Sequence, residues 1–547
     1  MTSFLPILPS HRVGTLAAFM VLTVLATPAS AQQKPTVSPA DYGRFENLGG
    51  ATLSPDGRWI AYGVRRVNDE TELRVKSLAL DSLWTMPWAS NPTFSPDGHW
   101  LAWTVGVSED ERKRLEKTKE RVRNGAGLMN LTTGEERTFE KVASFDFDAS
   151  GRYLVVHGYA PEEPEGKGAD LRVVALEAGT ETAFGNVGEY AWSDVGSTVA
   201  LALATGEAQG NGVQAYDAPT GRLVSLETSE SSYAHLAWRE DAADLAVLRS
   251  VSPAGEDGAA HDALAWRGLD RGQPEHLVLR VAEAGVPDSL ELVEHSAPRW
   301  SDDGMRIAIG LRPAEPSDDE DAGAESADSA ATAKGDQEEE LAGLQIWHTS
   351  DVRIVPQQQA SASRDERRTL LAVWHMDRGS VTQVGTDLLE SAELLDGWNL
   401  AVESLSAPYP WGAKFGRPYN DVWLVDVASG ERERVLERVR YSWESPGGGY
   451  LLSFDGEDYW SYDVQSSRRV NLTEGVPATF ADTLYDTPTD LLPPHGVGGW
   501  LQNDGAVLLY DRFDVWRVSP DGSGAMRLTR GAEEDVVHRV HDLDRDE

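Results

Sequence analysis

The chain has 547 residues and contains no cysteine. Disulfides, a thiol nucleophile and a thiolate metal site are therefore excluded. Basic residues are scarce, because 49 Lys and Arg stand against 89 Asp and Glu, which gives a formal net charge of −40. Such a charge repels a phosphate backbone, so we expect no nucleic-acid partner. Long apolar runs are absent beyond the N-terminus, so we expect no membrane contact once the N-terminal segment is removed.

The N-terminus has the layout of a targeting segment. His11 and Arg12 precede an apolar run over residues 13–26, and the triplet Ala29-Ser30-Ala31 follows. A basic start, a short apolar run and an A-x-A site are typical of a secretory signal peptide. The sequence therefore predicts a signal peptide over 1–31, a linker over 32–41, and an exported protein that is periplasmic or secreted.

A short unit built around a tight turn recurs nine times along the chain. It joins an apolar or aromatic residue, a polar turn and an apolar run, as in LSPDGRWIAY around Gly57 and FSPDGHWLAW around Gly98. Asp-Gly favours a hairpin turn, because Gly accepts a positive φ and Asp bonds its own backbone. Each copy therefore predicts two strands joined by a tight turn. The other copies lie at Gly151, Gly196, residues 238–248, Gly304, Gly397, Gly448 and Gly505.

A second hairpin pattern follows some of these copies. It begins with Asp, continues through Trp and a turn, and closes on Leu, at residues 421–436, 458–472 and 514–528. Two hairpins per repeat make a four-stranded antiparallel sheet, which is the blade of a β-propeller. The sequence thus predicts an all-β propeller over 42–531 with seven to nine blades, eight or nine being favoured. Residues 532–547 are then either a C-terminal tail or the start of a missing segment.

The recurring polar and aromatic residues of the unit have structural explanations. A turn aspartate that returns in blade after blade indicates hairpin chemistry, not a metal or acid site. Ser54 and Ser95 sit beside Pro and Asp, where a hydroxyl caps the turn. Tryptophans at one recurring place per repeat predict packing between blades.

Two insertions interrupt the repeats. In residues 108–124, Ser108 and Glu111 form a capping box, and strong helix formers continue to Asn124-Gly125, which predicts a solvated helix. Residues 315–340 are rich in acidic residues, Ala, Ser and Gly, which predicts a disordered loop inside the sixth blade.

No residues are predicted to be catalytic, metal-binding or cofactor-binding. His538 and His541 are three residues apart, but the acids around them favour an incidental charged tail over a metal site. His348 and His375 each follow a Trp in a strand-like run, which favours core or edge histidines. A propeller enzyme with carboxylates at the ring centre has no support in the sequence, and no cofactor motif is found.

SPDG-type blades after a secretory signal resemble the N-terminal propeller of the prolyl oligopeptidase (S9) family of serine peptidases, which includes dipeptidyl-peptidase-like and acylaminoacyl-peptidase-like enzymes. Residues 344–359, 367–385 and 510–531 are similar to stretches of large secreted bacterial members. Periplasmic TolB-like or WD40-like propellers are the weaker resemblance.

In the S9 family an α/β-hydrolase domain follows the propeller and carries its nucleophile in G-x-S-x-G. This chain contains no G-x-S-x-G, so no triad residue carries over and the chain alone is predicted to be inactive. Dipeptidyl-type relatives bind the substrate amine with a pair of glutamates from the propeller. Glu135-Glu136, Glu162-Glu163 and Glu533-Glu534 are candidates, but none lies in a matching motif and none is assigned.

The resemblance implies an exported propeller that gates or selects peptide substrates for a serine peptidase, without the catalytic domain in this chain. Its expected partners are peptides and a hydrolase domain, encoded downstream or supplied in trans. The alternative is a self-standing periplasmic TolB-like propeller that binds a protein or a ligand.

Overall fold

The structure is a computed structural model. It describes residues 38–39, 42, 45–66, 70–162, 167–206, 209–253, 260–314 and 351–541. The signal peptide predicted over 1–31, the acidic loop predicted over 315–340, and His348 lie outside these residues. Strands account for 48% of the described residues and helices for 9%, so the predicted all-β class is confirmed.

The strands form nine antiparallel blades in strict chain order. The first three blades comprise β1 (Glu46–Leu53), β2 (Trp59–Arg66), β3 (Thr71–Ser77) and β4 (Leu83–Pro87); β5 (Ala89–Phe94), β6 (Trp100–Val105), β7 (Gly125–Asn130) and β8 (Glu136–Phe139); and β9 (Val142–Phe147), β10 (Tyr153–Gly158), β11 (Ala169–Ala175) and β12 (Glu181–Trp192). The next three comprise the end of β12 with β13 (Thr198–Leu203), β14 (Asn211–Asp217) and β15 (Arg222–Ser229); β16 (Ser231–Trp238), β17 (Leu245–Pro253), β18 (His261–Arg267) and β19 (Glu275–Leu279); and β20 (Leu290–Leu292), β21 (Arg299–Trp300), β22 (Arg306–Pro313), β23 (Leu370–His375) and β24 (Ser380–Gln383). The last three comprise β25 (Ser391–Leu394), β26 (Leu400–Leu405), β27 (Asn420–Asp426) and β28 (Arg432–Val439); β29 (Tyr441–Glu444), β30 (Tyr450–Phe454), β31 (Tyr459–Asp463) and β32 (Arg468–Asn471); and β33 (Val497–Trp500), β34 (Val507–Tyr510), β35 (Val515–Val518) and β36 (Ala525–Arg527).

Each of the nine repeats in the sequence is the first hairpin of one blade. The second hairpin pattern is likewise confirmed as β27–β28, β31–β32 and β35–β36. One strand serves two blades, because β12 pairs with β11 over its first half and with β13 over its second half, and Val187 pairs with both.

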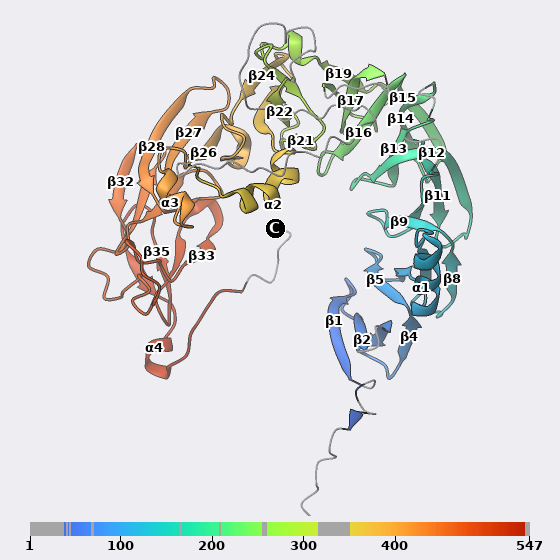
Figure 1. Ribbon diagram of the computed structural model, residues 1–547, viewed down its shortest axis with the longest axis horizontal. Coiled ribbons are helices and arrows are strands. Elements are labelled where there is room, and N and C mark those ends of the chain that lie inside the picture. Colours follow the sequence, from blue (N-terminus) through green and yellow to red (C-terminus); the bar gives the residue numbers. More distant parts are fainter. Residues whose placement is uncertain are drawn as a thin grey trace, which may run out of the picture.

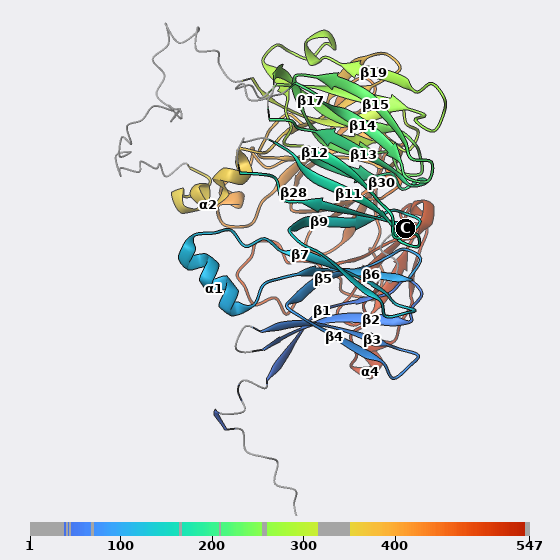
Figure 2. The same ribbon diagram turned by 90° about the vertical axis from the view of Figure 1, so that its right-hand side faces the viewer.

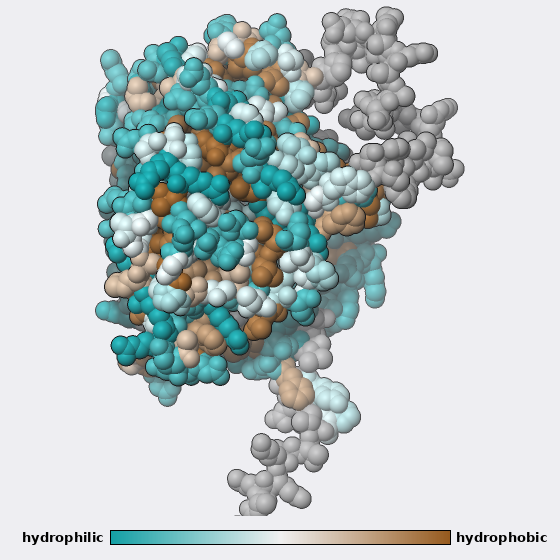
Figure 3. Space-filling model, turned by 90° about the vertical axis from the view of Figure 1, so that its left-hand side faces the viewer, coloured by the Kyte–Doolittle hydropathy of each residue, from teal (hydrophilic) through white to brown (hydrophobic). Residues whose placement is uncertain are grey.

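The blades follow one another around a ring (Figure 1). The first strands, such as β5, β9 and β16, lie toward the centre, and the fourth strands, such as β8, β19 and β32, lie at the periphery. Every blade consists of consecutive strands, so among the described residues no blade combines a strand from the start of the chain with one from its end. The first and ninth blades lie on either side of an opening in the ring (Figure 1). Seen from the side of β28 and β32, the surface is mostly hydrophilic with short apolar strips (Figure 3).

The core consists of layers between neighbouring blades. One large cluster joins Ala246 and Leu248 of the fifth blade to Ile307 and Ile309 of the sixth, all at most 1% exposed. A blade buries its faces only against its neighbours, so the ring is stabilised interface by interface.

Tryptophans connect successive blades by hydrogen bonds. The indole N–H groups of Trp192 and Trp238 donate to the backbone carbonyls of Asp146 and Ala191 at 3.2 and 3.0 Å. Trp300 makes the corresponding bond to the fifth blade at 3.0 Å. These tryptophans stand just before the turn, so the predicted packing role between blades is confirmed for them.

The turn residues also behave as predicted. The Ser54 hydroxyl donates to Asp56 at 2.6 Å and accepts the backbone N–H of Trp59 at 2.9 Å. Ser95 and Asp97 repeat this arrangement. These groups satisfy one another and close the hairpin, as expected for turn chemistry.

The helices are α1 (Glu109–Thr118), α2 (Val355–Asp365), α3 (Pro410–Lys414) and α4 (Gly531–Glu534), with 3-10 turns η2 (Val281–Glu283), η3 (Asp396–Trp398) and η4 (Gln502–Asp504). The helices α1, α2 and α3 all lie in connections between the second and third strands of a blade, and α1 and α2 project from the same face of the ring (Figure 2). None of the described helices combines the length and hydropathy needed to cross a bilayer.

One prediction about local structure was wrong in detail. The helix expected over 108–124 begins with the predicted Ser108 cap but ends at Thr118. Lys119 takes a left-handed conformation, and its N–H caps the carbonyl of Glu116. Residues 355–365, which overlap the stretch 344–359, form α2 inside the sixth blade, with Pro356 in the first turn.

Candidate functional site

Two carboxylates meet at the inner rim of the ring. Glu393 comes from β25 of the seventh blade, and Glu444 comes from the end of β29 of the eighth blade. Both are first strands, which lie toward the ring centre. A cavity of about 350 Å³ opens between the two strands, and Glu393, Glu444 and Asn420 contribute to its lining.

The repeat explains why a cavity exists at this interface. Glu444 stands directly before the turn, at the position that Trp192, Trp238 and Trp300 occupy in the fourth, fifth and sixth blades. Those tryptophans fill the interface and donate a hydrogen bond to the preceding blade. A glutamate is smaller and ends in a charged acceptor, so it leaves space and adds negative charge.

Burial and the neighbouring Glu393 both perturb Glu444. Burial raises the pKa of the half-buried Glu444 above its ordinary value, and the nearby Glu393 raises that pKa further through its charge and a shared hydrogen bond. Repulsion between the two carboxylates is one cause of this raised pKa, and a cation bound between them would relieve it.

No protein cation neutralises the pair. Arg440 also lines the cavity, but its guanidinium donates to Thr489 at 3.0 Å and lies 3.6 Å from Asp490. Within the described part of the chain, neither Glu393 nor Glu444 forms an ion pair with Lys or Arg. The pair is therefore suited to an external cation that can donate hydrogen bonds, such as an ammonium group.

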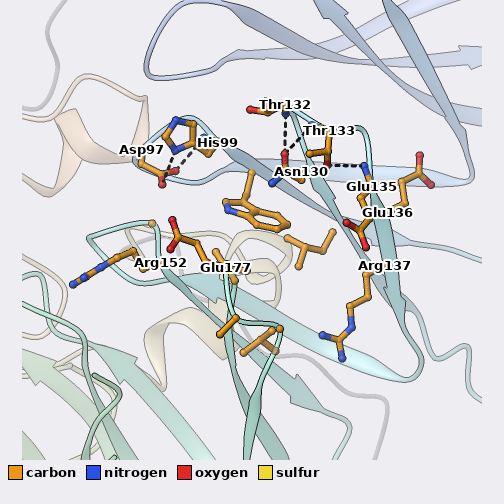
Figure 4. Close-up of a pocket in the computed structure, with 17 residues that line it drawn as sticks. Asp97, His99, Asn130, Thr132, Thr133, Glu135, Glu136, Arg137, Arg152 and Glu177 are labelled. Atoms are coloured by element: carbon orange, nitrogen blue, oxygen red, sulfur yellow. Dashed lines mark hydrogen bonds and ion pairs between the residues drawn. The ribbon is translucent and has the colours of Figure 1, made fainter. Parts of the chain in front are cut away.

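The candidate glutamates named from the sequence lie elsewhere. Glu135 and Glu136 line a cavity of about 490 Å³ between the second and third blades (Figure 4). Polar groups there bond locally, as Asn130 does to the N–H of Thr132 and Asp97 does to His99 (Figure 4). A similar groove of about 370 Å³ lies between the fourth and fifth blades, so this cavity is a recurrent product of blade stacking.

The other candidates remain without a site. Glu533 in α4 pairs with Arg527, while Glu163 lies outside the described residues. His375 is 5% exposed and bonds Thr382 at 3.1 Å, which agrees with a core histidine. No group of three His, Asp or Glu in the described ranges is placed to hold a metal ion.

Sequence reasoning missed Glu393 and Glu444. A signal for Glu444 existed, because ESPGG places a carboxylate where WSDDG has its tryptophan. Glu393 gave no signal, since it belongs to an alternating strand and reaches Glu444 only through the packing of two blades.

No family model matches the chain, and no curated protein does. Among solved structures, the chain is similar to the β-propeller domain of the trilobed protease from Pyrococcus furiosus, with 11% identity and a TM-score of 0.29 over 73% of this chain and 97% of that one. It is also similar to Pyrococcus horikoshii acylaminoacyl peptidase, with 9% identity and a TM-score of 0.28 over 77% of this chain and 58% of that one. A third match is a eukaryotic initiation factor, with 11% identity and a TM-score of 0.37 over 78% and 88%.

The first of these matches is the propeller domain of a protease, and the second is a peptidase. The chain spans a little over half of the acylaminoacyl peptidase. At these identities and TM-scores the matches decide nothing about activity.

Proposed function

We propose that this propeller selects peptides for a serine peptidase of the S9 type, and that Glu393 and Glu444 hold the N-terminal ammonium of the peptide. The observation that carries the proposal is the pair of carboxylates without a cation, set in a cavity at the inner rim of the ring. The S9 resemblance of the sequence supplies the peptide as the class of substrate.

The chemistry of an ammonium group fits this pair. Such a group has three N–H donors and one positive charge, so it can bond both carboxylates at once and relieve their repulsion. Binding should therefore favour the ionised form of Glu444. Because the pKa of Glu444 is raised, affinity for the ammonium should increase as the pH rises through that pKa.

The position of the cavity at the inner rim would let the ring select peptides by size. A peptide held at the inner rim has its free end in the centre of the ring, where a folded protein is excluded by size. On this proposal a hydrolase domain carries out the hydrolysis, and the propeller contributes to which peptides reach it.

The test compares one short peptide, Gly-Ala-Ala-amide, with its N-acetylated form by calorimetric titration. We expect the free amine to bind and the acetylated peptide to bind at least about tenfold more weakly. Glu444→Gln and Glu393→Gln should each weaken binding of the amine by about tenfold, because either change removes half of the negative charge.

Glu444→Trp is the informative second variant. It places at this interface the residue used by three other blades, so it should fill the cavity and abolish amine binding while the protein stays folded. Asp486→Asn, which removes an exposed charge outside the cavity, serves as the control. Equal binding of the amine and acetylated peptides would reject the proposal, and tight binding of a folded protein instead would favour a self-standing binding propeller.

A further inference from the structure

A second cavity is built from aromatic side chains in the connection between β26 and β27. Trp411 in α3 and Phe415 just after it are 67% and 69% exposed. Their rings lie 6.4 Å apart and only 12° from parallel. The two nearly parallel rings form an exposed apolar platform of a kind that a folded chain would otherwise bury.

The walls of this cavity are fixed by hydrogen bonds to carboxylates. The cavity measures about 440 Å³, and Tyr409 and Tyr419 line it together with the platform. The Tyr409 hydroxyl donates to Asp421 at 2.6 Å, and the Tyr419 hydroxyl donates to Asp490 at 2.7 Å. The rings are thereby held in place, and these carboxylate oxygens already have donors.

The remaining polar groups at the cavity are cationic. The Arg438 guanidinium lies 4.8 Å from the centre of the Tyr419 ring, and no ion pair with a carboxylate is seen for it within the described ranges. Arg417 also lines the cavity and donates to the Pro488 carbonyl. In a chain with a net charge of −40, a lining with two arginines and one carboxylate, Asp490, is a local reversal of sign.

We infer that this cavity binds the carboxylate of a peptide next to an aromatic residue. The aromatic side chain would stack on Trp411 and Phe415, and the carboxylate would take the guanidinium of Arg438 as its partner. A neutral sugar fits less well, because its hydroxyls need acceptors as well as donors and the carboxylates of the cavity are occupied. The carboxylate can be a peptide C-terminus or an acidic side chain.

This site is separate from the pair Glu393 and Glu444, although Tyr419 and Asn420 are consecutive and make the two cavities neighbours. The probes are therefore N-acetylated, so that they have no free amine for the glutamate pair and the titration measures binding to the aromatic cavity alone. Three are used: acetyl-Gly-Ala-Phe with a free carboxylate, the same peptide as its amide, and acetyl-Asp-Phe-amide.

We expect the free acid to bind in calorimetric titration and its amide to bind at least about tenfold more weakly. Trp411→Ala should weaken binding of the acid by at least about tenfold. Arg438→Gln should weaken binding of the acid by about fivefold or more and leave the amide unchanged. Both side chains are exposed, and circular dichroism will verify that the variants remain folded.

Phe45→Ala, which removes another exposed ring, is the matched control and should bind like the unaltered protein. Acetyl-Asp-Phe-amide that binds as well as the free acid assigns the carboxylate to a side chain, and its failure to bind assigns the carboxylate to a C-terminus. Either result supports the inference. Equal affinity for acid and amide, unchanged affinity in Trp411→Ala, or binding of a neutral oligosaccharide in place of the peptides would overturn it.

Discussion

Asp514 anchors the outer edge of the ninth blade, and its replacement by Asn tests how that edge is held. Asp514 is fully buried, and it accepts hydrogen bonds from Thr529 at 2.7 Å and from the Gly531 N–H at 2.5 Å. Its other oxygen accepts from Arg527 at 2.9 Å. One carboxylate thus ties the start of β35 to the end of β36 and to the first residue of α4.

The pKa of Asp514 gives the size of the electrostatic contribution that its carboxylate makes to the stability of the fold. Burial alone would raise this pKa, but the hydrogen bonds from Thr529, the Gly531 and Ala532 N–H groups and Arg527 outweigh it and lower the pKa to about 2. From an ordinary 3.8, that lowering corresponds to about 2.5 kcal/mol of stability at neutral pH. Because the Arg527 side chain is 29% exposed, solvent screens the attraction, and we discount the figure to about 1 kcal/mol.

Asp514→Asn loses more than this charge. The amide nitrogen of Asn cannot accept a hydrogen bond, so at least one buried donor around residue 514 is left without a partner. An unsatisfied buried donor adds about 1–2 kcal/mol, so we expect a total near 2–3 kcal/mol.

Hydrogen exchange of the amides in β35 and β36 measures this cost locally, because a ring of repeats need not unfold in one step. A loss of about 2 kcal/mol should accelerate their exchange by about 30-fold. Asp486→Asn removes the same charge from an exposed position and should change nothing. Acceleration of less than about twofold, or equal acceleration in both variants, would refute the reasoning.

The pH dependence supplies a second check. A lowered folded pKa contributes stability above the unfolded pKa, and that stability is lost as the pH falls toward about 2. The difference between the unaltered protein and Asp514→Asn should therefore shrink on acidification.

Three further outcomes are expected. The contribution of Glu444 to stability changes with pH in the opposite direction to that of Asp514, because the pKa of Glu444 is raised in the folded protein. This contribution stabilises the fold at low pH and is lost as the pH rises through the raised pKa. Urea unfolding at several pH values should show this loss in the unaltered protein and not in Glu444→Gln. Trp238→Phe removes the hydrogen bond to the Ala191 carbonyl and should lower the stability of this blade interface by about 1 kcal/mol, which hydrogen exchange would show as faster exchange of the β16 amides. Unchanged exchange would contradict the role of Trp238 in connecting the blades. Ser108→Ala removes the cap on the Glu111 N–H and should weaken α1 by about 1 kcal/mol, seen as faster proteolysis there, while Ser108→Asp should not.

The sequence by itself determined the architecture, because the architecture is local. A hairpin needs only a turn and two apolar runs, so nine turns such as those at Gly57 and Gly98 were enough to predict seven to nine blades, and the described residues form nine. The sequence also showed the Asp that opens the second hairpin pattern, but it did not show which groups this Asp would hydrogen-bond. Asp514 has a partner 15 residues away at Thr529, and only the closed hairpin brings the two together.

Tertiary structure decided the candidate sites, because they arise between elements that are distant in sequence. Glu393 and Glu444 belong to different repeats and meet only because two blades stack side by side. The aromatic cavity likewise combines α3 with Asp490 from the connection between the eighth and ninth blades. Periodicity predicts which residues form a blade, whereas the contact of one blade with the next depends on the geometry of the whole ring.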